Sequence, residues 1–106
     1  MKLVRDKIIE LIDNPKYHKA DDKEYIKSLG NKLIEEFDEL IENPCEEEMA
    51  DILEVVFAIS DYYNFNRDLV VGAKSVKFKE RGGFSNRIIL EEWDVGYDKK
   101  EKGDKI

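Results

Sequence analysis

The fold is decided by residues 33–59, which read LIEEFDELIENPCEEEMADILEVVFAI. Before Asn43-Pro44, apolar residues recur every three or four positions, the period of an amphipathic helix. They are Ile26, Leu29, Leu33, Phe37, Leu40 and Ile41. After the junction, residues 49–59 are polar only at Asp51 and Glu54, which predicts a helix buried on most of its sides. Asn43 suits an N-cap and Pro44 the first helical position, so this second helix is expected to begin there.

The flanking segments predict two more helices, so the fold class is all-α, a bundle of about four helices. A short first helix is expected over residues 3–12 and ends near Asn14-Pro15, because proline stops a helix. The expected N-caps are Asp21 or Asp22 for the helix before the junction, and Asn64 or Asn66 for the last helix. That last helix should stop at Gly82-Gly83. Residues 87–91 are expected to be a short strand or extended chain.

Length and composition narrow the class of protein. The 106 residues suit one domain, expected over 1–95, with a charged, flexible tail over 96–106. With 41% charged and 42% hydrophobic residues, the chain is neither disordered nor membrane-spanning. The net charge of -7 argues against nucleic acid as a partner. One cysteine and one histidine exclude an intrachain disulfide and the usual zinc sites, which favours a cytoplasmic location.

Acidic residues on both sides of Asn43-Pro44 predict a metal site. Glu36 and Asp51 lie equally far from the junction, and so do Glu39 and Glu48. In an antiparallel hairpin each pair therefore lies at one level, and four carboxylates converge. Glu48 and Asp51 are also in line with apolar positions, and the nearby sequence offers them no obvious basic partner. An oxygen-rich site of this kind suits Mg²⁺, with Mn²⁺ as the alternative.

Each of these patterns has a simpler interpretation. Runs of acids on helices are commonly solvated faces, and the lysines near residue 80 suit a helix C-terminus. The helix after Asn43-Pro44 is nevertheless apolar on more of its surface than a four-helix monomer can cover, which predicts a homodimer or higher homo-oligomer.

Three sequence blocks in order resemble the MazG-like nucleotide pyrophosphohydrolases, in particular the phosphoribosyl-ATP pyrophosphohydrolase-like branch. They are KLVRDKI (2–8), the EExxE and ExxD motifs (35–39 and 48–51), and KERGGFSNRIIL (79–90). Two departures are the spacing of only eight residues between the motifs, and Ile9 where the branch often has proline. The resemblance implies an all-α enzyme that hydrolyses a nucleoside triphosphate between its α and β phosphates.

The resemblance also implies roles for single residues. Glu36, Glu39, Glu48 and Asp51 would hold Mg²⁺, and Glu35 would orient or deprotonate the attacking water. The expected phosphate ligands are basic residues from both ends of the chain, namely Arg81, Lys74, Lys77, Lys79, Lys2, Arg5 and Lys7. Two alternatives stay open: a phosphoribosyl-ATP pyrophosphohydrolase of histidine biosynthesis, and a non-catalytic acidic helical binding module.

Overall fold

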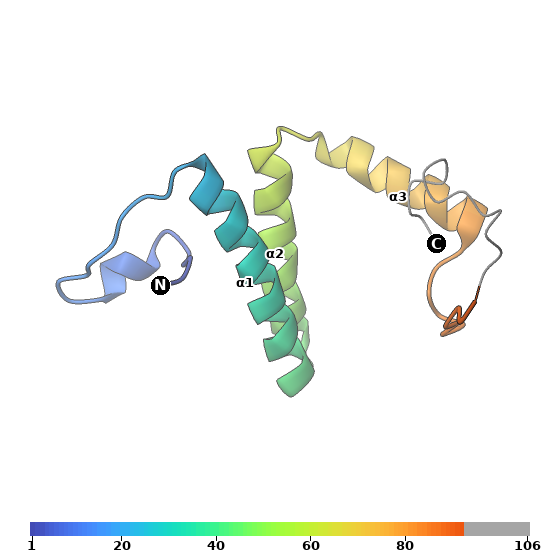
Figure 1. Cartoon of the computed structure of the whole chain (residues 1–106), viewed down its shortest axis with the longest axis horizontal. Helices are drawn as coiled ribbons and strands as arrows, with labels where there is room; N and C mark the ends of the chain where they lie inside the picture. The colour runs from blue at the N-terminus through green and yellow to red at the C-terminus, as the bar shows by residue number, and fades with distance from the viewer. Residues whose placement is uncertain (93–106) are drawn as a thin grey trace. The chain divides into compact units, whose positions relative to one another are not determined.

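The computed structural model describes residues 1–92, which contain three α-helices and one 3-10 helix and no strand. The helices are η1 (Ile8–Leu11), α1 (Asp22–Glu42), α2 (Glu46–Tyr62) and α3 (Arg67–Arg81) (Figure 1). This confirms the all-α class. Two compact units are distinguished, Met1–Val71 and a second that begins at Gly72. The single domain over 1–95 therefore stays a prediction, and the expected tail over 96–106 lies outside the described residues.

The first predicted helix, over residues 3–12, is wrong in length. Only Ile8–Leu11 is helical, and it is a 3-10 turn in which the Ile8 N–H donates to the Arg5 carbonyl at 3.0 Å. Lys7 stands at the N-cap and gives no side-chain hydrogen bond. So short a segment gains too few backbone hydrogen bonds to offset the cost of starting an α-helix.

Helix α1 begins where the sequence predicts and runs unbroken through Gly30. The Asp21 carboxylate accepts a hydrogen bond from the Glu24 N–H at 2.9 Å, as an N-cap does. The helix ends at Asn43, whose N–H donates to the Glu39 carbonyl at 2.9 Å.

The predicted start of the next helix at Asn43-Pro44 is wrong by two residues. Asn43 caps the end of α1, and α2 begins at Glu46 after Cys45, which gives no side-chain cap. The cause is local, because a residue before proline avoids helical backbone angles, and Asn43 has φ -139° and ψ 76°. Three glutamates in the first turn of α2 interact favourably with the helix dipole instead.

Helices α1 and α2 pack side by side as an antiparallel hairpin that positions the acidic residues (Figure 1). The buried apolar residues of the described chain are Leu29 and Val55, at 2% and 7% exposure. The second helix of the hairpin is therefore not covered on most sides, since Leu53 stays 49% exposed. No described helix has the length and apolar character needed to cross a membrane.

Helix α3 confirms the last predicted helix. Asn66 caps its start, because its side-chain oxygen accepts from the Leu69 N–H at 3.1 Å. Gly82 ends it with φ +80°, a left-handed angle that favours glycine, and its N–H donates to the Phe78 carbonyl at 2.8 Å. Residues 87–92 that follow form neither helix nor strand.

Candidate metal centre

The structure brings the acidic residues of the hairpin together in two groups of three. Glu36, Glu48 and Asp51 place one carboxylate oxygen each within 4.8 Å of one another, and so do Glu35, Glu36 and Glu39. Glu36 belongs to both groups. The four predicted ligands therefore gather around Glu36, at facing positions of α1 and α2.

Burial separates this cluster from an ordinary acidic surface. The Glu36 side chain is only 9% exposed. Its Oε2 atom and the Oε2 atom of Glu48 are buried and have no hydrogen-bond partner among the described residues. Because a buried carboxylate oxygen without a partner is costly, this site is chemically suited to a cation.

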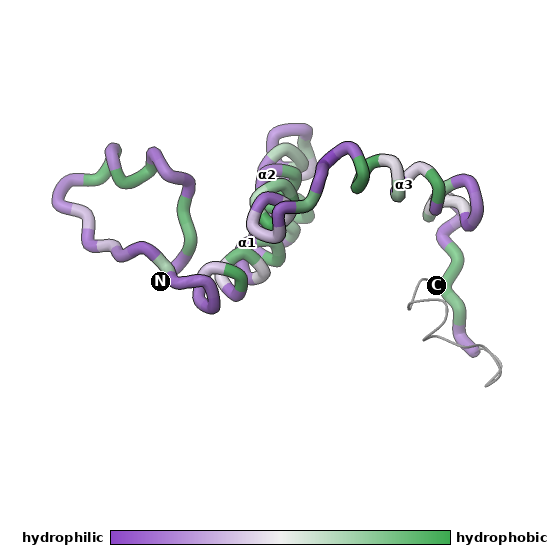
Figure 2. Tube along the Cα trace, turned by 90° about the horizontal axis from the view of Figure 1, so that it is seen from above, coloured by the Kyte–Doolittle hydropathy of each residue, from purple (hydrophilic) through white to green (hydrophobic). Residues whose placement is uncertain are grey.

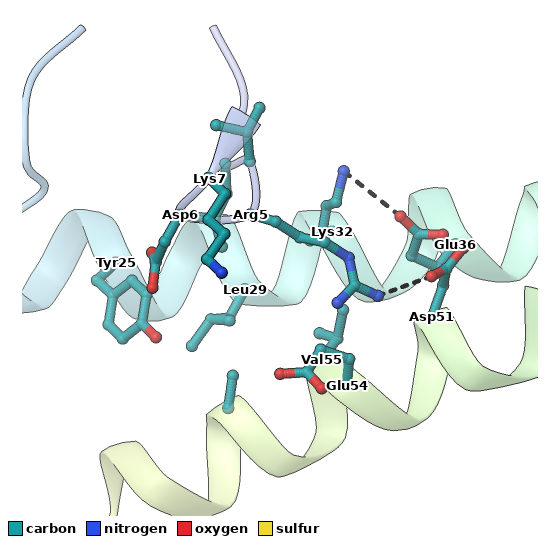
Figure 3. A pocket seen from close by; sticks show the side chains of 13 residues that line it. Arg5, Asp6, Lys7, Tyr25, Leu29, Lys32, Glu36, Asp51, Glu54 and Val55 are labelled. Atoms are coloured by element: carbon teal, nitrogen blue, oxygen red, sulfur yellow. Dashed lines mark hydrogen bonds and ion pairs between the residues drawn. The ribbon is translucent and has the colours of Figure 1, made fainter. Parts of the chain in front are cut away.

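Three basic side chains reach the cluster. Arg5 Nη2 lies 2.7 Å from Asp51 Oδ1 (Figure 3). Lys32 Nζ lies 3.4 Å from Glu36 Oε1 and 3.5 Å from Glu35 Oε1. Lys2 Nζ lies 3.1 Å from Glu35 Oε1. The nearby sequence offers Asp51 no basic partner, but the N-terminal segment folds back against the hairpin and supplies Arg5.

Lys32 is a site residue that sequence reasoning missed. Its spacing of three and four residues from Glu35 and Glu36 is the signal that could have identified it. The structure adds that its side chain is only 17% exposed, so the amino group lies within the cluster.

The charge balance of the cluster leaves room for a divalent cation. Five carboxylates, Glu35, Glu36, Glu39, Glu48 and Asp51, face the three paired cations, which leaves two formal negative charges. All the ligand atoms are oxygens, which Mg²⁺ and Mn²⁺ prefer.

The pKa values follow the same electrostatics. The hydrogen bond from Lys2 lowers the pKa of Glu35, and the same contact raises the pKa of Lys2. The pKa of Glu39 is raised, first by the negative charge of Glu36 and next by desolvation. Glu35 is therefore a poorer base than an ordinary glutamate, whereas the neighbouring negative charge disfavours the charged form of Glu39.

A cavity of about 460 Å³ opens beside the cluster within the first unit. The N-terminal segment forms one wall through residues 3–7, and α1 and α2 form the others. Figure 3 shows Glu36, Asp51 and Arg5 at one end, with Tyr25 and Leu29 toward the other. Asp6 and Lys7 also line the end near Tyr25, so charged and apolar side chains are mixed along the cavity. A cavity of this size with such a lining suits a small amphipathic ligand.

The predicted basic residues fall into two sets. Arg5 and Lys7 line the cavity, and Lys2 pairs with Glu35. The other four are exposed along α3, in the second unit of the chain; they are Lys74, Lys77, Lys79 and Arg81. Their role as phosphate ligands stays a prediction. Lys79 and Arg81 lie in the last helical turn, where the helix dipole also favours cations.

No family model, curated protein or solved structure matches this chain. The family resemblance therefore rests on the sequence motifs alone.

Proposed function

We propose that this protein is a Mg²⁺-dependent nucleoside triphosphate pyrophosphohydrolase, which yields a nucleoside monophosphate and pyrophosphate. The observation that carries the proposal is the buried Glu36 carboxylate. Its Oε2 atom lacks a partner among residues 1–92, and Glu36 lies beside Glu48 and Asp51 at one end of a ligand-sized cavity. A solvated acidic face would not bury unpaired carboxylate oxygens at such a position.

The residues of the cluster divide the work in this proposal. Glu36, Glu39, Glu48 and Asp51 would hold the metal ion, Mg²⁺ or Mn²⁺. The chemistry that such an ion supplies when bound is a more acidic water and neutralisation of charge on phosphate oxygens. Glu35 is assigned to orient or deprotonate the attacking water, because it is the extra acid of the EExxE motif and lies beside Glu36 and Glu39.

The cavity beside the cluster is proposed to hold the substrate. Arg5 and Lys7 are cations that can contact phosphate oxygens, and an arginine fork suits a phosphate well. Tyr25 and Leu29 offer an apolar surface to the nucleoside. Lys74, Lys77, Lys79 and Arg81 are proposed as further phosphate ligands, on the grounds of the family resemblance alone.

A substrate panel tests the proposed function. Pyrophosphate release is measured with Mg²⁺ or Mn²⁺ on ordinary and modified nucleoside triphosphates and on phosphoribosyl-ATP. Turnover of a nucleoside triphosphate supports a role in cleaning the nucleotide pool, whereas preference for phosphoribosyl-ATP indicates the histidine pathway. No turnover and no metal binding would indicate a non-catalytic acidic module.

Matched variants connect that activity to the cluster. Glu36→Gln should abolish turnover, because it removes the charge of the one residue that belongs to both groups of three acids. Asp38→Asn is the control, since Asp38 lies between the same acids in sequence but is exposed and belongs to neither group. Equal activity of the two variants would refute the proposed metal centre.

We further infer that the chain forms a homodimer or a higher homo-oligomer. Helices α1 and α2 each carry a stripe of exposed large apolar side chains at helical spacing, and Figure 2 shows hydrophobic residues along both helices. The stripes consist of Ile34, Phe37 and Ile41 on α1, and Met49, Leu53 and Val56 on α2. A second copy would remove these side chains from water and enlarge the core, in which two apolar residues are buried among residues 1–92. A cytoplasmic location remains part of the same proposal.

A further inference from the structure

Arg5 occupies a carboxylate that the proposed metal centre needs. Its Nη2 atom lies 2.7 Å from Oδ1 of Asp51, while Asp51 also belongs to the group with Glu36 and Glu48. A guanidinium and a divalent cation on the same carboxylate group repel each other at short distance. Arg5 and the metal ion therefore compete for Asp51.

The pair formed by Arg5 and Asp51 can be broken at low cost. The side chains are 56% and 38% exposed, and ion pairs as exposed as this contribute little to stability. Arg5 also precedes the short helix η1 and lines the cavity wall, so its long side chain has space on the cavity side.

Lys32 differs from Arg5 in its exposure and in how its side chain is held. It is only 17% exposed and is held on α1 at three and four residues from its partners Glu35 and Glu36. If its amino group moved away from both glutamates while it stayed buried, it would become an unpaired charge, which is costly. Of these two cations, Arg5 is the one that can withdraw.

We propose that Arg5 is a replaceable counterion, which neutralises Asp51 in the metal-free protein and turns toward the phosphates in the cavity when a divalent cation takes its place. This device rests on the proposed function, because it assumes that the cluster binds a metal ion and that the cavity takes a phosphate-bearing ligand. It makes metal binding weaker in the absence of substrate. By linkage, metal and phosphate then favour each other's binding.

Calorimetric titration of Mn²⁺ without nucleotide tests the competition. Arg5→Gln should bind Mn²⁺ about three- to fivefold more tightly than wild type, because no guanidinium has to be displaced. The matched control is Lys7→Gln, which removes a charge of the same sign from the same segment and the same cavity wall. Lys7 forms no ion pair within residues 1–92, so its variant should change the affinity less than twofold.

A second measurement follows Arg5 directly by NMR. Adding diamagnetic Mg²⁺ to the wild-type protein should shift the Nε–Hε signal of Arg5. Arg67 serves as an internal reference. It pairs with Asp61, an acid outside the cluster, at 2.9 Å, and its signal should stay in place.

The outcomes separate this inference from the proposed function. Tighter Mn²⁺ binding by Arg5→Gln than by Lys7→Gln, with movement of the Arg5 signal, supports the counterion role. Equal affinities in wild type and both variants, or an Arg5 signal unmoved by saturating Mg²⁺, overturn it and leave the metal centre standing. Failure of all three proteins to bind Mn²⁺ overturns the metal centre and the counterion role together.

Discussion

Glu48→Gln is the sharpest test of the metal centre, because the chain supplies a matched control one residue away. Glu47 and Glu48 both lie in the first turn of α2, where a negative charge interacts favourably with the helix dipole. Replacing either by glutamine loses the same dipole interaction. Only Glu48 belongs to the carboxylate group with Glu36 and Asp51, whereas Glu47 is exposed. A difference between the two variants therefore reports the cluster alone.

The metal-free proteins should already differ. The oxygen of Glu48 lies within 4.8 Å of those of Glu36 and Asp51, and two unit charges at that distance repel by about 0.9 kcal/mol even in water. Glutamine keeps the shape and removes this repulsion. We expect metal-free Glu48→Gln to be at least as stable as Glu47→Gln.

Metal should reverse this order. At a Mn²⁺ concentration of about 100 times Kd, a site present only in the folded state adds about 2.7 kcal/mol. At about 4–8 °C per kcal/mol for a small domain, the melting temperature of wild type and Glu47→Gln rises by about 11–22 °C. If Glu48→Gln binds about 100-fold more weakly, the same concentration adds only about 0.4 kcal/mol, or about 2–3 °C.

The assay is thermal unfolding of the three proteins across a Mn²⁺ titration, which needs no knowledge of the substrate. Pyrophosphate release on the best substrate of the panel is then measured with the same samples, and Glu48→Gln should be inactive. A metal-dependent rise in melting temperature for Glu48→Gln as large as that for Glu47→Gln would show that Glu48 is not a ligand. The facing positions of the four acids about Asn43-Pro44 would then have no bearing on metal binding.

Three further measurements probe other parts of the molecule. Lys2→Met should lower the free energy of unfolding at pH 7, because Lys2 lowers the pKa of Glu35 in the folded state. This stabilisation is lost as Glu35 is protonated. The difference from wild type should therefore disappear as the pH falls below the usual glutamate pKa of 4.5. Urea unfolding between pH 7 and pH 3 measures this, and a difference that does not shrink as the pH falls contradicts it. Light scattering at micromolar concentration should give at least twice the chain mass of 12.4 kDa, and Phe37→Glu should shift the protein toward the monomer; a wild-type monomer would refute the proposed interface. Arg81→Ala should lower kcat/KM by about one to two decades while Mn²⁺ affinity stays the same, since one charged hydrogen bond to phosphate is lost; unchanged kinetics would remove Arg81 from the site.

The sequence was sufficient for most features that are controlled by local interactions. Hydrophobic period predicts α1, α2 and α3, and the caps Asp21, Asn66 and Gly82 act within a few residues of their own positions. The grouping of Glu36 with Glu48 and Asp51 was also predictable, because a short connection makes the two helices antiparallel neighbours. The start of α2 was misplaced since two local preferences conflict at the junction, and the restriction that Pro44 imposes on Asn43 prevails.

The contacts of the N-terminal segment were decided only by the tertiary structure. Arg5 is 46 residues from Asp51 in sequence, so no spacing rule relates the two, and Lys2 is 33 residues from Glu35. The cavity forms only when this segment lies against α1 and α2, since residues 3–7 are part of its lining. Helical period assigns a residue to a face of its own helix, but burial and ion pairing depend on which distant segment covers that face.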